Sequence, residues 1–100
     1  MTDHSPAFRS TAEVATAHAS RYLQQLCKHF GHKLPVNFDP QSGRVAFSAG
    51  DCRLQAGETA LTMTVEAADE AGIAQLQDVV ARHLVRFAFR EELAFDWRPG

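Results

Sequence analysis

The apolar positions of the chain follow two periods, each in its own stretch of sequence. Before residue 31 and again after Asp69 they recur every three or four positions, as they do on one face of a helix. Between residues 36 and 67 they alternate with polar positions, which is typical of strands that bury one face. The pattern therefore predicts a helix, several strands and a second helix, in that order.

The first helical pattern predicts a helix over residues 11–30. Ser10–Glu13 fits a capping box, in which the hydroxyl of the first residue and the carboxylate of the last bind free amides. Gly31 suits the end of a helix, and Pro35 prevents much continuation. The apolar stripe comprises Ala15, Ala19, Tyr22, Leu23, Leu26 and Phe30.

The middle of the chain predicts four strands joined by three tight turns. The turns fall at residues 39–43, 49–51 and 57–59, where Asp, Pro, Ser or Gly gather. The alternating apolar positions are Val36, Phe38, Val45, Phe47, Cys52, Leu54, Ala56, Leu61, Met63, Val65 and Ala67. The polar positions between them include Asn37, Arg44, Arg53, Gln55, Thr62, Thr64 and Glu66. Such alternation implies a sheet with one dry face and one largely wet face.

The second helix is expected to begin after Asp69, a natural N-cap. Its apolar stripe comprises Ile73, Leu76, Val80, Leu84 and Phe87. Alternation in Ser5–Arg9 and in Leu93–Trp97 would add a short strand near each end of the chain.

The dry face of the sheet must be covered, and the two helices carry the only apolar stripes available. We therefore expect one α+β domain over residues 1–100, a two-layer sandwich with an antiparallel sheet and both helices on one face. The element order is β-α-β-β-β-β-α, to which Leu93–Trp97 could add a C-terminal strand. This architecture resembles the TATA-binding-protein-like and helix-grip folds, and a resemblance at that level assigns no function.

Composition and charge exclude several classes of function. The formal net charge is −2, whereas proteins that rely on phosphate contacts usually carry a basic excess, so nucleic acid is not an expected partner. No apolar stretch approaches the roughly 20 residues of a membrane helix. The first residues lack the charged and apolar regions of a signal peptide. We expect a cytoplasmic protein with no membrane association.

Two cysteines, Cys27 and Cys52, are too few for a disulfide framework. A reducing compartment would keep both as thiols. Each falls on or beside an apolar face, so inert buried thiols are the expectation.

No motif identifies a reaction, since a Gly-rich phosphate loop, a nucleophile elbow, paired CxxC and HExxH are all absent from the sequence. The histidines are then the candidates for chemistry. His29 and His32 flank the end of the first helix, and His83 lies beside the stripe of the second, with Glu91 or Cys27 nearby. They could bind iron or zinc, which would need further ligands, or act as acid or base, although the sequence requires no cofactor. The alternative is a structural role, with the imidazole bonded to a backbone carbonyl.

Arg82, Arg86 and Arg90 are spaced by four residues and line one face of the second helix. Like charges at this spacing oppose helix formation, so they either form a ridge for an acidic ligand or partner or simply face water. The polar face of the sheet leaves similar alternatives. It could meet water, form the floor of a ligand site, or pair with a second copy in a homodimer.

Three phrases resemble the bacterial domain-of-unknown-function family 2218, namely Arg21–Leu23, Leu26–Lys33 and His83–Glu91, with Trp97 in addition. The resemblance covers nearly the whole chain, and the two histidine-containing phrases are its most specific parts. The family has no established activity, but some relatives accompany or are fused to siderophore-interacting flavin reductases, which release iron from chelates. The resemblance therefore implies a role near iron acquisition or metal handling, with such a reductase as a partner.

The leading hypothesis is a binding domain, rather than an enzyme, that takes a small ligand, a metal chelate or a partner protein. One competing hypothesis is a small enzyme in which His29 or His83 is a general base oriented by Glu91. The other is a structural homodimer.

Overall fold

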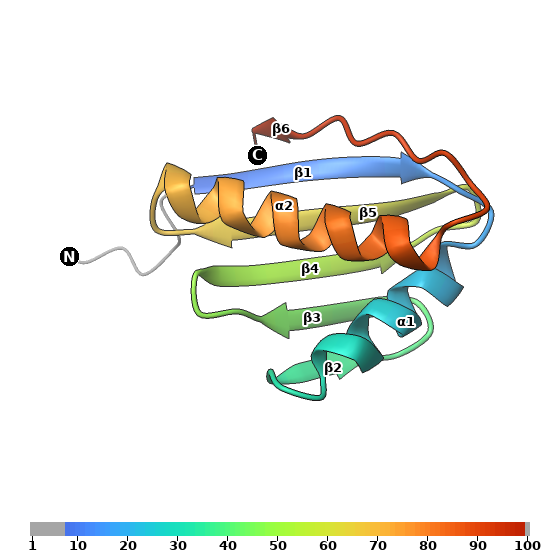
Figure 1. Cartoon of the computed structure of the whole chain (residues 1–100), viewed down its shortest axis with the longest axis horizontal. Helices are drawn as coiled ribbons and strands as arrows, with labels where there is room; N and C mark the ends of the chain where they lie inside the picture. Colours follow the sequence, from blue (N-terminus) through green and yellow to red (C-terminus); the bar gives the residue numbers. More distant parts are fainter. Residues whose placement is uncertain (1–7, 100) are drawn as a thin grey trace.

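A computed structural model describes residues 8–99 of the chain (Figure 1). Its elements are β1 (Phe8–Ala15), α1 (Ala19–Phe30), β2 (Val36–Phe38), β3 (Ser42–Ala46), β4 (Gly50–Ala56), β5 (Ala60–Ala67), α2 (Glu70–Phe87) and β6 (Arg98–Pro99). The strands form one antiparallel sheet in the order β2-β3-β4-β5-β1-β6, and both helices lie on the same face of it. The predicted α+β architecture is confirmed, with a short strand added at the C-terminus.

The core lies between the helices and the inner face of the sheet. Leu54 of β4 pairs with Met63 of β5, which in turn pairs with Ala12 of β1, so that three neighbouring strands present one apolar row. Leu26 of α1 and Leu84 of α2 belong to the same buried cluster, and all five residues are at most 3% exposed. Each large aliphatic side chain buried in this way contributes about 1.5–3 kcal/mol. The prediction that the dry face of the sheet packs against the apolar stripes of the two helices is confirmed.

Gly43 lets α1 approach β3 closely. A Cβ atom at Gly43 would lie 2.7 Å from Cys27 Sγ and 3.1 Å from Phe38 Cβ, which is inside normal contact distance. Because glycine leaves this space open, α1 rests directly on the β2–β3 side of the sheet. The end of α1 thereby reaches the β3–β4 turn, where the rings of Phe30 and Phe47 meet with centroids 5.0 Å apart.

The predicted start of the first helix is wrong. Residues 11–15 belong to β1, and α1 begins only at Ala19. No capping box forms, because Ser10 Oγ donates to the Arg98 carbonyl oxygen at 3.1 Å and accepts from Gln77 Nε2 at 3.0 Å. The buried positions of this segment alternate, as in a strand: Ser10, Ala12, Val14 and Thr16. Pairing with β5 along all of β1 stabilises the extended form.

The strands predicted near the chain ends are displaced. Of Ser5–Arg9, residues 5–7 lie outside the described residues, and β1 begins at Phe8. Leu93–Trp97 forms no strand, since β6 comprises only Arg98 and Pro99 beside β1. The alternation in this segment comes from side chains packed against the core: Leu93, Phe95 and Trp97.

The predicted N-cap is confirmed, whereas the turn predicted at residues 49–51 lies at residues 47–49, because β4 already begins at Gly50. Asp69 Oδ1 accepts a hydrogen bond from the Gly72 amide at 2.7 Å, at the start of α2. Gly50 has a φ of +157°, and a Cβ there would lie 1.9 Å from the Glu66 carbonyl oxygen, so only glycine fits. Within residues 8–99, no helix is long and apolar enough to span a membrane.

Both cysteines are free thiols in the core, as predicted. Burial raises the pKa of the Cys27 thiol to about 11 and that of the Cys52 thiol to about 12. Thiols of this kind stay protonated and are poor nucleophiles or metal ligands at neutral pH. Cys27 is therefore a packing residue rather than a ligand for the histidines.

Candidate functional site

The three candidate histidines line one pocket of about 390 Å³ at the C-terminal end of α1. The end of α1 and the turn after it form one side, the β3–β4 turn a second side and α2 a third. The lining residues are His29, Phe30, His32, Lys33, Leu34, Phe47 and His83. A concave, largely apolar hollow with a few polar groups is the usual form of a small-molecule site. We call it the histidine pocket.

The rings of the histidine pocket pack against one another. The imidazole of His83 lies with its centroid 4.9 Å from those of His29 and Phe30, and Phe30 in turn meets Phe47. His83 Nδ1 lies 2.7 Å from the Val79 carbonyl oxygen, which can only accept, so Nδ1 carries the proton. Nε2 is then the nitrogen able to accept a proton or a ligand. The hydrogen bond to a backbone carbonyl that was expected of a structural histidine is present in His83, and His83 also lines a pocket.

Positive groups surround His29, and none of the pocket's lining residues is acidic. Partial burial lowers the pKa of His29, and the nearby His83, Arg86, His32 and Lys33 lower it further. The His29 imidazole is therefore neutral at physiological pH. Because the neighbouring lysine and arginine carry positive charge, the pocket favours an anion.

The pocket does not offer a complete set of metal ligands. In the described part of the chain, no three His, Cys, Asp or Glu side chains lie close enough together to bind one ion. Structural zinc sites use four protein ligands, and catalytic sites three. The arrangement therefore suits a ligand that brings its own charge and donor atoms better than a bare iron or zinc ion.

Glu91 lies apart from the histidine pocket, in a second hollow of about 400 Å³. Its carboxylate accepts hydrogen bonds from the hydroxyls of Tyr22 and Thr16. The Tyr22 bond, opposed by partial burial and aided by Thr16 and His18, lowers the pKa of Glu91. Glu91 is therefore in no position to orient His83. The sequence carried no signal for the Tyr22–Glu91 contact, because the two residues are 69 positions apart.

The second hollow also contains residues that sequence reasoning did not group. Its lining residues are His18, Arg21, Tyr22, Gln25, Phe87, Phe89, Arg90 and Glu91. His18, Tyr22 and Gln25 follow one another at helical spacing and form one side of this hollow, and the residues at the end of α2 and after it complete the lining. Phe87 lies between the two hollows, since its ring also meets His29 at a centroid distance of 5.8 Å. We call this hollow the tyrosine pocket.

The predicted arginine ridge divides into three different environments. Arg82 forms an ion pair with Asp78, Nε to Oδ2, at 3.4 Å. Arg86 is near enough to His29 to lower its pKa, and the guanidinium of Arg90 lies 5.4 Å from the centroid of the Phe89 ring. Of the three arginines, Arg90 lines the tyrosine pocket and Arg86 lies near His29 of the histidine pocket, so these two are the candidates for anion binding.

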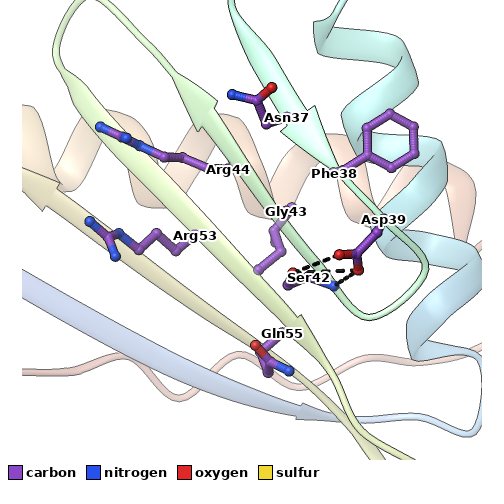
Figure 2. A pocket seen from close by; sticks show the side chains of 9 residues that line it. Asn37, Phe38, Asp39, Ser42, Gly43, Arg44, Arg53 and Gln55 are labelled. Carbon is purple, nitrogen blue, oxygen red and sulfur yellow. Dashed lines mark hydrogen bonds between the residues drawn. The ribbon is translucent and has the colours of Figure 1, made fainter.

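The outer face of the sheet has a shallow hollow of about 500 Å³ over β2–β4 (Figure 2). Arg44 and Arg53 extend from neighbouring strands in the same direction, as the figure shows. Each has an acidic partner that the figure does not draw: Arg44 forms an ion pair with Asp51, and Arg53 Nε lies 3.5 Å from Glu66 Oε1. Because both arginines are paired with protein carboxylates, this hollow is a weaker candidate for an anion site than the histidine pocket.

Other charges of the sheet face are also satisfied. Asp39 accepts from the amides of Gln41 and Ser42, which lower the pKa of its carboxyl. Glu66, expected in water, is only 6% exposed because Arg9 covers it through a 2.8 Å ion pair.

The fold defines the chain as an α+β two-layer sandwich, which over residues 8–99 has a six-stranded antiparallel sheet and two helices on one face. The chain belongs to the family described as an uncharacterized protein conserved in bacteria (DUF2218), whose model matches residues 11–98. The resemblance seen in the sequence is thereby confirmed. The NMR structure of PA4090 from Pseudomonas aeruginosa is similar, with 42% identity and a TM-score of 0.79 over 92% of this chain and 96% of that one. No curated protein matches the chain.

Proposed function

We propose that the protein is a non-enzymatic cytoplasmic binding domain that takes a small anionic ligand with an aromatic or other apolar body in the histidine pocket. The observation that carries the proposal is the composition of that pocket. Three imidazoles and two phenyl rings surround a hollow of about 390 Å³ that has a lysine at its edge and no acidic lining residue.

The two halves of the pocket suit two parts of one ligand. Phe47 is only partly buried and offers an apolar ring on which a planar group can pack, and the buried ring of Phe30 supports it at a centroid distance of 5.0 Å. Lys33 lines the pocket, Arg86 lies near His29, and neither has an ion-pair partner within residues 8–99. An anion placed there would gain attraction without displacing a protein carboxylate.

Among such ligands we propose a ferric chelate of the catecholate type, in keeping with the siderophore link that the family resemblance implies. A chelate brings its own oxygen donors, so the protein need not supply a set of metal ligands. Its aromatic rings and net negative charge match the stacking surface and the cations of the pocket. A siderophore-interacting reductase is the proposed partner, because it would act on the same chelate.

Calorimetric and fluorescence titration with ferric 2,3-dihydroxybenzoate, the free acid and Fe³⁺ or Zn²⁺ alone tests the proposal. We expect saturable binding of the chelate, weaker binding of the free acid and none of the bare ions. Lys33→Ala and His29→Ala should each weaken binding about tenfold, the equivalent of about 1.4 kcal/mol. His18→Ala is the matched control, because this histidine precedes the same helix but lines the other pocket.

Two results would overturn the proposal. One is the absence of saturable binding of any aryl anion by the wild-type chain. The other is a loss of affinity in His18→Ala equal to that in His29→Ala, because binding would then not be at the histidine pocket. Binding of bare Fe³⁺ or Zn²⁺ that is lost on replacement of His29 and His83 would instead indicate a metal site.

A further inference from the structure

The tyrosine pocket places two unpaired arginines over a common hollow. Arg21 comes from the first turn of α1, and Arg90 from the turn after α2. Neither has an acidic partner in the part of the chain that the structure describes. By contrast, the arginines of the strands β1, β3, β4 and β6 are all ion-paired: Arg9, Arg44, Arg53 and Arg98.

The carboxylate that lines the same pocket as these arginines is already engaged by other donors. Glu91 accepts from the Tyr22 hydroxyl, and Thr16 Oγ1 lies 3.1 and 3.2 Å from its two oxygens. These donors are neutral hydroxyls, and within residues 8–99 no guanidinium lies within ion-pair distance of this carboxylate. The pocket thus retains two positive charges against one negative charge.

An aromatic surface lies beside these charges. Phe89 is 77% exposed, the most exposed large apolar side chain of residues 8–99, although a ring this size normally packs. The Arg90 guanidinium lies 5.4 Å from its centroid, and Phe87 forms the inner part of the same lining. A ring bound here would cover Phe89 while its acidic group met Arg21 and Arg90.

We infer that the tyrosine pocket is a second binding site, for a small aryl anion whose carboxylate or phosphate is held by Arg21 and Arg90 and whose ring covers Phe89. Guanidinium forks match both acidic groups in a bidentate manner. The site is separate from the histidine pocket, since Phe87 lies between the two, and it goes beyond the proposed function. Glu91 would orient the site by fixing Tyr22 and the turn after α2, without touching the acidic group.

A ¹H–¹⁵N NMR titration of the full chain with phenyl phosphate, benzoate and inorganic phosphate tests this inference. We expect saturable shifts at residues 18–25 and 87–91, including the Nε–H signals of Arg21 and Arg90, that form a set separate from any shifts at the histidine pocket. The double variant Arg21→Gln/Arg90→Gln should bind phenyl phosphate at least tenfold more weakly. Arg82→Gln, an arginine of α2 that is paired with Asp78, is the matched control and should change the affinity less than twofold.

Phe89→Ala separates the contribution of the ring from that of the charge. It should weaken phenyl phosphate and benzoate severalfold and leave inorganic phosphate unchanged, while the two aryl probes rank carboxylate against phosphate. Shifts that do not saturate, that occur only at His29–Lys33, or that respond equally to Arg82→Gln would overturn the site. Phenyl phosphate and inorganic phosphate of equal affinity in wild type would overturn the aryl part of it. Both arginines are exposed, and an unchanged spectrum of the free double variant would verify its fold.

Discussion

Tyr22 and Glu91 show how one contact can join three segments that are distant in the sequence. Tyr22 lies in α1, Thr16 follows β1, and Glu91 follows α2. The two hydroxyl groups donate to the one carboxylate, so this contact joins α1 and the end of β1 to the turn after α2. Tyr22 is only 5% exposed, and burial and the carboxylate together raise the pKa of its phenol. The phenol therefore remains a donor, and the carboxylate remains its ionised acceptor.

The first prediction concerns the pH dependence of this contact. Because the folded pKa of Glu91 is lowered from its usual 4.5, ionised Glu91 stabilises the fold above pH 4.5, and this contribution is lost as pH falls through the lowered value. Tyr22→Phe removes the main cause of the shift. We expect it to lower the unfolding temperature at pH 7 and to differ less from wild type below pH 4.

Thermal unfolding by circular dichroism between pH 3 and pH 8 measures this difference. Glu91→Gln provides the matched background, because its amide oxygen can accept the hydrogen bond but does not titrate. In that background the effect of Tyr22→Phe should not depend on pH between 3 and 6. A Tyr22→Phe effect that is as large at pH 3 as at pH 7 would contradict the assignment.

Residue patterns gave part of the site and missed the rest. His29 and His32 are close in the sequence. Because the apolar stripes of both helices face the same side of the sheet, His83 beside the second stripe could be expected near them. Glu91 was misplaced because it follows α2, where the chain leaves helical geometry and periodicity no longer gives direction. Arg90 and Phe89 follow the same helix end, so the tyrosine pocket could not be drawn from sequence alone.

At the scale of elements, β1 is the one for which the sequence pattern gave a wrong prediction. Ser10–Glu13 satisfies a helix-start pattern, yet Ala12 and Val14 also satisfy strand alternation, and a short window supports both. The choice is made by β5, whose eight residues pair with β1 although about 50 positions separate them. Tertiary pairing of this kind overrides local propensity and is absent from any local window. The four-strand meander was predictable because each of its pairings is between neighbours in the chain.

The second prediction tests the close packing of α1 on β3. Gly43→Ala should lower the free energy of unfolding by about 1–3 kcal/mol, because the new Cβ would overlap Cys27 Sγ and Phe38 Cβ. Removing the sulfur with Cys27→Ala opens a small cavity and also destabilises. In the double variant the alanine methyl would occupy that space. We expect the double variant to be more stable than the sum of the single effects by about 1 kcal/mol.

Urea unfolding of the four chains measures this coupling. Gly57→Ala is the matched control, since its Cβ would approach nothing nearer than the Ala60 carbonyl oxygen at 3.4 Å. It should change the free energy of unfolding by less than about 0.5 kcal/mol. Strictly additive effects of Gly43→Ala and Cys27→Ala would show that α1 does not rest on Gly43 as described.

At the scale of the molecule, the charges are distributed unevenly between the two layers. The arginines of the sheet are neutralised by acidic neighbours. The cations without an ion-pair partner within residues 8–99 all lie in α1, in the turn after it, or at the C-terminal end of α2: Arg21, Lys28, Lys33, Arg86 and Arg90. The unpaired cations of the described residues therefore gather in the helical layer, although the whole chain has a formal net charge of −2. Both pockets open on this layer, which explains why net charge alone gave no hint of anion binding.

This distribution leads to the last prediction, on the salt dependence of binding at the histidine pocket. The Debye length falls from about 30 Å at 0.01 M salt to about 3 Å at 1 M, so attraction by Lys33 and Arg86 is screened across that range. The dissociation constant for ferric 2,3-dihydroxybenzoate should rise about tenfold, which corresponds to about 1.4 kcal/mol. In Lys33→Ala the rise should be clearly smaller, because one of the screened charges is gone. Arg98→Ala removes a cation that is paired with Asp96 at 2.8 Å, and it should keep the salt dependence of wild type. If Lys33→Ala and Arg98→Ala changed the slope equally, the ligand would be sensing only the total charge of the chain and not the unpaired cations beside the pocket.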